Sequence, residues 1–100
     1  MITITAIIRS KKGQEETLKT ALLEVAQYVN KNEPDTVSFY ISQDLGDATV
    51  FTTYERFASK AAMDTHNGST AVQLFFDKAR PILDGEVILV TAREISQKYS

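Results

Sequence analysis

Hydrophobic and polar positions alternate one by one at residues 2–9 of this chain and again at residues 36–44. Alternation with a period of two, in segments rich in β-branched residues, is typical of β-strands. Ile2, Ile4, Ala6 and Ile8 alternate with Thr3, Thr5, Ile7 and Arg9, and Val37, Phe39 and Ile41 alternate with Ser38, Tyr40 and Ser42. Further strands are predicted at residues 48–55 and 86–95, and the short turn before residue 48 predicts a hairpin of the second and third strands.

A helical pattern fills the gap between the first two strands. Leu18, Leu22, Val25 and Val29 recur on one helical stripe, and Glu15 and Glu16 precede them, where a helix N-terminus favours negative charge. This helix is expected to end at about Asn32, because the residue before Pro34 is disfavoured in a helix.

Two helical segments are predicted after the third strand. Ser59 is expected to cap a short helix that ends at His66, and Asn67-Gly68 interrupts it. Ser69 or Thr70 can cap the next segment. The apolar side of that segment consists of Val72, Phe75, Phe76, Ala79, Ile82 and Leu83.

The predicted order is β-α-β-β-α-β, which indicates an α+β fold of the ferredoxin-like type, with both helices on one face of a four-stranded antiparallel sheet. The last strand is apolar on both of its faces at residues 87–90, and the first strand is so at Ile7 and Ile8. Helices can cover only one sheet face, so a second copy of the chain is expected to cover the other and form a homodimer. The alternative is that these residues only raise the local β propensity.

Composition narrows the class of protein. A chain of 100 residues is expected to form one domain, residues 1–100, and its net charge of −2 without a basic patch argues against nucleic-acid binding. The N-terminus lacks the features of a signal peptide, and no apolar run is long enough to span a membrane. Together with the absence of cysteine, these features favour a soluble cytoplasmic protein.

His66 is the only histidine, and Glu55 lies upstream of it at the end of the third predicted strand. A histidine titrates near neutral pH and could remove a phenolic or enolic proton from a substrate. Glu55 could orient it. The structural alternatives are that His66 closes its helix on the backbone at Asn67-Gly68, and that Glu55 caps the helix start at residues 58–61.

Aromatic residues supply the candidate substrate-binding wall. These are Phe39, Phe51, Tyr54, Phe75 and Phe76, which could surround a planar ligand or simply belong to the core. Arg56 and Arg93 could steady an anion, or could lie in solvent. With one histidine and no cysteine, there is no metal-ligand cluster, and no phosphate loop or nucleophile elbow is present.

Several segments resemble the antibiotic-biosynthesis-monooxygenase superfamily of dimeric α/β barrels. The most specific is Tyr54-Glu55-Arg56-Phe57-Ala58-Ser59-Lys60-Ala61-Ala62 running on to His66. Three others are residues 2–6 leading to residues 12–16, residues 32–36, and residues 82–85. Phe57 stands where the family often has tryptophan, and the first strand lacks the asparagine of the haem-degrading branch.

The resemblance implies a homodimer that binds a small aromatic or quinone-like ligand. It implies a cofactor-independent monooxygenase that oxidises such a molecule with O₂, with His66 as base and Glu55 in support. Neither haem, flavin nor metal is expected. The alternatives are a non-catalytic ligand-binding or stress-responsive dimer, and an isomerase of a small signalling molecule that uses the same base without O₂.

Overall fold

The computed structural model describes residues 1–98, which form one four-stranded sheet and three α-helices. In chain order the elements are β1 (Ile2–Arg9), α1 (Glu15–Asn32), β2 (Thr36–Gln43), β3 (Val50–Phe57), α2 (Lys60–Asn67), α3 (Thr70–Ala79), a 3₁₀ turn η1 (Arg80–Ile82) and β4 (Ile88–Arg93). The strands lie in the order β2-β3-β1-β4, and every neighbouring pair is antiparallel. The predicted α+β fold of the ferredoxin-like type is therefore confirmed.

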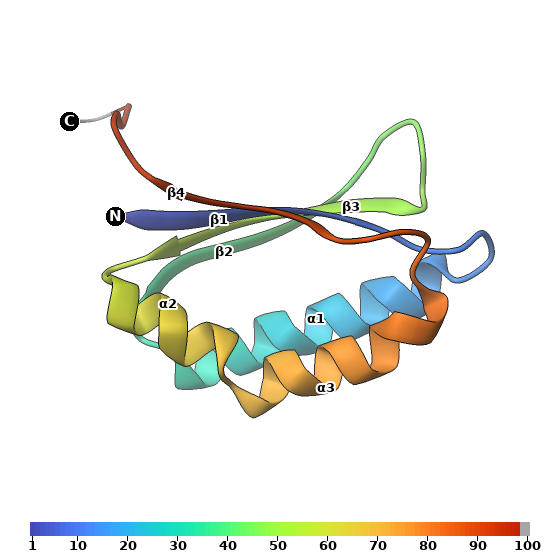
Figure 1. Cartoon of the computed structure of the whole chain (residues 1–100), viewed down its shortest axis with the longest axis horizontal. Helices are drawn as coiled ribbons and strands as arrows, with labels where there is room; N and C mark the ends of the chain where they lie inside the picture. The colour runs from blue at the N-terminus through green and yellow to red at the C-terminus, as the bar shows by residue number, and fades with distance from the viewer. Residues whose placement is uncertain (99–100) are drawn as a thin grey trace.

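All three helices lie against one face of the sheet (Figure 1). The core fills the space between the two layers. It contains Ala6 and Ile8 of β1, the α1 stripe that includes Leu18, Leu22, Val25 and Val29, and Phe51, Phe75 and Ala79. The apolar stripe predicted for the first helix is thus the surface that packs on the sheet.

The segment between β3 and β4 contains two capped helices. Ser59 Oγ accepts a hydrogen bond from the Ala62 amide at 3.1 Å, and Ser69 Oγ accepts one from the Val72 amide at 3.2 Å. Each serine thus satisfies a free amide at a helix start. The element order within residues 1–98 is β-α-β-β-α-α-β, and Ser69, rather than Thr70, is the second cap.

Val37 departs from the predicted alternation of β2. It is 46% exposed, whereas Phe39 and Ile41 pack against the core. The pairing of β2 with β3 shifts between Thr36 and Ser38, so one extra residue is inserted into β2. A bulge of this kind reverses the side of the strand to which the earlier residues point.

The sheet face opposite the helices, called here the helix-free face, carries a row of side chains across four strands. Tyr40 pairs with Tyr54, Tyr54 with Thr5, and Thr5 with Val90. Ile7 pairs with Ile88 on the same face. These tyrosine, valine and isoleucine side chains are between 39% and 61% exposed, so apolar surface lies open along this face.

Candidate functional site

The last turn of α2 carries His66 into the space between the helices and the sheet. The residue is only 4% exposed. Its ring lies against two aromatic side chains, with centroid distances of 5.5 Å to Phe39 of β2 and 5.4 Å to Phe57 of β3. The Ser59 cap fixes where α2 begins, and His66 follows two helical turns later. The only histidine of the chain is therefore held in a largely apolar setting.

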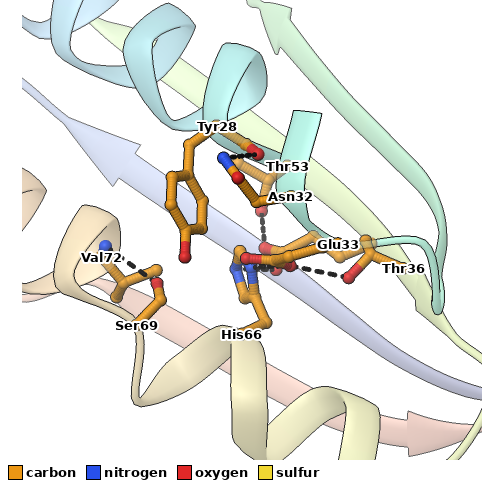
Figure 2. Close-up of polar contacts among 9 residues, drawn as sticks. Tyr28, Asn32, Glu33, Thr36, Thr53, His66, Ser69 and Val72 are labelled. Atoms are coloured by element: carbon orange, nitrogen blue, oxygen red, sulfur yellow. Dashed lines mark hydrogen bonds and ion pairs between the residues drawn. The ribbon is translucent and has the colours of Figure 1, made fainter. Parts of the chain in front are cut away.

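Two buried carboxyl groups contact the two ring nitrogens of His66. Glu33 Oε1 lies 2.9 Å from Nδ1, and Glu55 Oε1 lies 3.2 Å from Nε2. Each glutamate is held by a threonine, because Thr36 donates to Glu33 Oε1 at 2.8 Å and Thr53 donates to Glu55 Oε2 at 2.7 Å. Figure 2 shows Glu33, from the end of α1, meeting His66 beneath it. We call these three residues the Glu33–His66–Glu55 cluster.

The cluster favours a proton on His66. Burial alone lowers the pKa of a histidine, but hydrogen bonding and charge from Glu55, together with the charge and hydrogen bond of Glu33, outweigh burial and raise the pKa of His66 above its usual range. The imidazole therefore binds a proton more tightly than a free histidine does.

The raised pKa predicts how stability depends on pH. A group whose pKa is higher in the folded state contributes stability below its unfolded pKa, about 6.5 for histidine, and loses that contribution as pH rises through the folded pKa. The free energy of unfolding, measured by urea titration at fixed protein concentration, should therefore fall as pH rises above about 6.5. The variant His66→Gln should lack this decline, and parallel pH dependences of the two proteins would contradict the prediction.

An apolar cavity of about 80 Å³ adjoins the cluster. Its polar wall comes from Thr53, Glu55, His66 and Asn67. The rest of the wall is apolar and consists of Ile4, Ala6, Ile8, Leu22, Val25, Phe39, Val72, Phe75, Phe76, Val87 and Leu89. One acid/base pair thus faces a space that is otherwise lined mainly by hydrocarbon and aromatic side chains, which is the composition expected of a small-molecule site.

The structure brings together only part of the predicted aromatic wall. Phe39, Phe75 and Phe76 line the cavity. Phe51 is 1% exposed and belongs to the core, without bordering the cavity. Tyr54 lies on the helix-free face, because neighbouring residues of a strand point to opposite sides and Glu55 points toward the helices.

The two arginines lie away from the cavity. Arg56 follows Glu55 on β3 and donates from Nε and Nη2 to Glu94 Oε1, at 3.1 Å each. Arg93 is at the exposed end of β4 and does not border the cavity. Neither guanidinium group is placed to steady an anion beside His66.

Two structural alternatives from the sequence differ from what is observed. Glu55 does not cap the following helix, because its side chain shares the helix-facing side of β3 with Thr53 and bonds there. Ser59 caps α2 instead. His66 also does not close α2 through its ring, since both ring nitrogens contact carboxyl groups.

Glu33 is the cluster member that sequence reasoning did not identify. It directly follows α1, and its side chain is only 5% exposed. A negatively charged residue at a helix C-terminus interacts unfavourably with the helix dipole. The position of Glu33, just before Pro34, was therefore the sequence signal that another group compensates its charge. His66 supplies that compensation from a distant part of the chain.

Within residues 1–98, no group of three or more histidine, aspartate or glutamate side chains could hold a metal ion. The carboxyl groups of the cluster contact opposite ring nitrogens of His66, so their oxygens do not converge on one point. Among the same residues, no helix has both the length and the apolar character needed to cross a bilayer.

A family model described as antibiotic biosynthesis monooxygenase matches residues 1–78. The chain belongs to this family. The match contains Glu33, Glu55 and His66 and ends within α3. The family membership expected from the residues around Glu55 and His66 is therefore confirmed. A comparison with curated proteins gave no significant match.

Solved structures share the fold of this family member at low sequence identity. A Nitrosomonas europaea protein, described as a candidate antibiotic biosynthesis monooxygenase, is 20% identical, with a TM-score of 0.87 over 96% of this chain and 100% of that chain. A Caulobacter crescentus protein with a similar description is 18% identical, with a TM-score of 0.88 over 95% and 90%. A Pseudomonas aeruginosa structure is 20% identical, with a TM-score of 0.85 over 95% and 94%. At such identities the similarity establishes the fold.

Proposed function

We propose that this protein is a cofactor-independent monooxygenase that oxidises a small phenol or quinol with O₂. The observation that carries the proposal is the placement of the only imidazole of the chain, next to a carboxyl group, in the wall of an apolar cavity. Membership of the antibiotic biosynthesis monooxygenase family supports the same class of reaction.

The proposed reaction begins with removal of the substrate hydroxyl proton by neutral His66. In that form Nδ1–H donates to Glu33, and the lone pair of Nε2 accepts the substrate proton beside Glu55. The imidazolium that results lies between two carboxyl groups, which stabilise its charge. His66 is thus the proposed general base, and Glu55 the neighbouring group that supports it.

The phenolate can then transfer one electron to O₂, and the phenoxyl radical and superoxide combine to form a peroxide at a ring carbon. Cleavage of the O–O bond, with loss of the hydrogen from that carbon, gives a quinone and hydroxide. His66 returns its proton to the hydroxide. The sum is one phenol and one O₂ converted to one quinone and one water, so the base regains its starting state.

The cavity limits the size of the proposed substrate. Drug-sized ligands occupy pockets of about 300–1,000 Å³, and the space beside His66 is about 80 Å³. A single ring fits this space better than a fused polycycle. Phe39, Phe75 and Phe76 would contact the ring faces and edges.

Oxygen consumption tests the proposal. Purified protein with a panel of monocyclic phenols and hydroquinones should consume O₂ above the uncatalysed rate, with one O₂ used per quinone formed. Hydrogen–deuterium exchange into a substrate without O₂ use would instead identify an isomerase. Binding of panel members, with no exchange and no O₂ use, would identify a ligand-binding protein.

We further propose that two copies associate through the helix-free face. Ile7, Ile88 and Val90 are apolar and between 39% and 57% exposed there. An open apolar surface of this kind favours association. The proposal concerns a face separate from the cavity, which lies on the helix side of the sheet.

Substitution of Ile88 by lysine should convert the proposed dimer to a monomer, because an ammonium group buried between two apolar sheet faces would lack a partner. Leu89→Lys is the matched control: Leu89 pairs with Ala6, points to the helix side and borders the cavity. Analytical ultracentrifugation at micromolar concentration should show a monomer only for Ile88→Lys. A monomeric wild-type protein would refute the proposed association.

A further inference from the structure

A second pocket adjoins the Glu33–His66–Glu55 cluster at Glu33, whereas the apolar cavity adjoins it at His66 and Glu55. The volume of the second pocket is also about 80 Å³, and it is lined by Asn32, Glu33, Pro34, Asp35, Thr36, Ala62 and Thr65. We call it the Glu33 pocket. Several of its lining residues are exposed, including Asn32, Asp35 and Thr65, so this pocket lies at the surface where α1 ends.

The two pockets differ in chemical character. The apolar cavity is lined chiefly by hydrocarbon and aromatic side chains, whereas amide, hydroxyl and carboxyl groups make up much of the wall of the Glu33 pocket. Ordered water needs polar partners and room, and the Glu33 pocket offers both. Of these two pockets, Glu33 borders the Glu33 pocket, and His66 and Glu55 border the apolar cavity.

Glu33 carries a carboxyl oxygen that no other described residue satisfies. Oε1 accepts from Thr36 and contacts His66 Nδ1, but the buried Oε2 has no hydrogen-bond partner within residues 1–98. Buried polar atoms are nearly always paired with protein or water. The residue that borders the Glu33 pocket therefore carries a carboxyl oxygen that is free to take up a proton.

We propose that Glu55, His66 and Glu33 form a path that carries protons between the apolar cavity and solvent, with Glu33 as its solvent end. The contacts along it are 3.2 Å from Glu55 to Nε2 and 2.9 Å from Nδ1 to Glu33. A proton that arrives at Nε2 can be followed by loss of the proton on Nδ1 without rotation of the ring. The ring is then the Nε2–H tautomer, and a transfer in the opposite direction restores the starting form. No atom is oxidised or reduced in this step.

In the proposed oxidation, the path would let His66 exchange protons with solvent. This role rests on the proposed function, whereas the path itself does not. His66 accepts a substrate proton only when it is neutral, so a resting imidazolium must first lose a proton. A ring-shaped ligand in the apolar cavity would separate Nε2 from water on that side. Release of the Nδ1 proton through Glu33 leaves the remaining hydrogen on Nε2. Transfer of that hydrogen to Glu55, together with return of a proton from Glu33 to Nδ1, then gives the working tautomer while the cavity is filled.

Of the two acids that contact His66, Glu33 is the one that borders the surface pocket. The acids facing the ring are Glu33 from the end of α1 and Glu55 from β3. β2 presents Phe39, and β3 also presents Phe57. The charges on α2 itself, Lys60 and Asp64, pair with each other at 2.9 Å on its exposed side. Asp35 is the other acid in the wall of the Glu33 pocket.

Exchange of the imidazole protons with water tests the path without any substrate. Because the chain has one histidine, protein labelled with ¹⁵N at histidine gives one pair of ring signals. In Glu33→Gln the side-chain oxygen can still accept from Nδ1–H but cannot take up the proton. We expect this variant to slow exchange about tenfold or more, because exchange would then require local opening of the fold. Glu33→Asp, which keeps a carboxyl group, should restore part of the rate.

Two further variants separate the solvent side from the cavity side. Ala62→Val narrows the Glu33 pocket and should slow exchange, whereas Val72→Phe fills the apolar cavity and should leave it unchanged. Slow exchange only in Val72→Phe would overturn the proposal, because the proton would then enter through the cavity. Equal rates in all variants would also overturn it. Since no variant is scored by O₂ uptake, a protein that oxidises nothing could still have the path, and an active one could lack it.

Discussion

Replacement of His66 by glutamine should lower the turnover of an accepted phenol or quinol by about 10²–10⁴-fold, the usual contribution of a positioned general base. The amide group of glutamine has two N–H donors, so it can bond to both Glu33 and Glu55 in place of the ring. It cannot accept a proton at neutral pH. The variant therefore removes the base and keeps the donor pattern that holds the cluster together.

The pH dependence of turnover separates a base from a structural histidine. If neutral His66 is the working form, kcat for the wild-type protein rises with pH through the raised pKa of His66. The residual activity of His66→Gln should lack this rise. Tyr54→Phe is the matched control, because Tyr54 lies on the opposite sheet face and its loss should leave kcat unchanged. Full activity of His66→Gln with the wild-type profile would assign His66 to structure alone.

Local patterns were enough to predict the layers of this fold. The α1 stripe from Leu18 to Val29 and the serine caps at Ser59 and Ser69 act within a few residues of their own positions. Their structural effect is therefore visible in the sequence. Val37 shows the limit of such patterns. The bulge at this position depends on how β2 pairs with β3, and the register of that pairing cannot be read from the sequence of β2 alone.

The candidate site was predictable only in part, because its members meet through tertiary contacts. Glu55 and His66 were found by their residue types and by the family resemblance around them. Glu33 directly follows α1, and only the packing of α1 and α2 on the same face of the sheet brings its carboxyl group to Nδ1 of His66. The positions of Phe51 and Tyr54 also became clear only from the structure. Residue type alone does not show whether an aromatic side chain lies in the core, in the cavity wall or on the opposite sheet face.

Replacement of His66 by alanine should destabilise the protein by about 3–5 kcal/mol, the usual cost of removing one partner of a buried charged pair. The change leaves the carboxyl groups of Glu33 and Glu55 facing an empty space, with side chains only 5% and 8% exposed. It also removes the ring that packs on Phe39 and Phe57. Urea denaturation at fixed protein concentration should show the loss as a lower midpoint.

Companion variants test whether the carboxyl groups cause this instability. His66→Gln keeps two donors for them and should lose much less stability than His66→Ala. Adding Glu33→Gln and Glu55→Gln to His66→Ala should recover part of the loss, because neutral amides tolerate burial better than unpaired carboxylates. Non-additivity of this kind is expected for residues in direct contact. If His66→Ala is as stable as the wild-type protein, the cluster does not hold α1, α2 and β3 together, and the imidazole contributes to function alone.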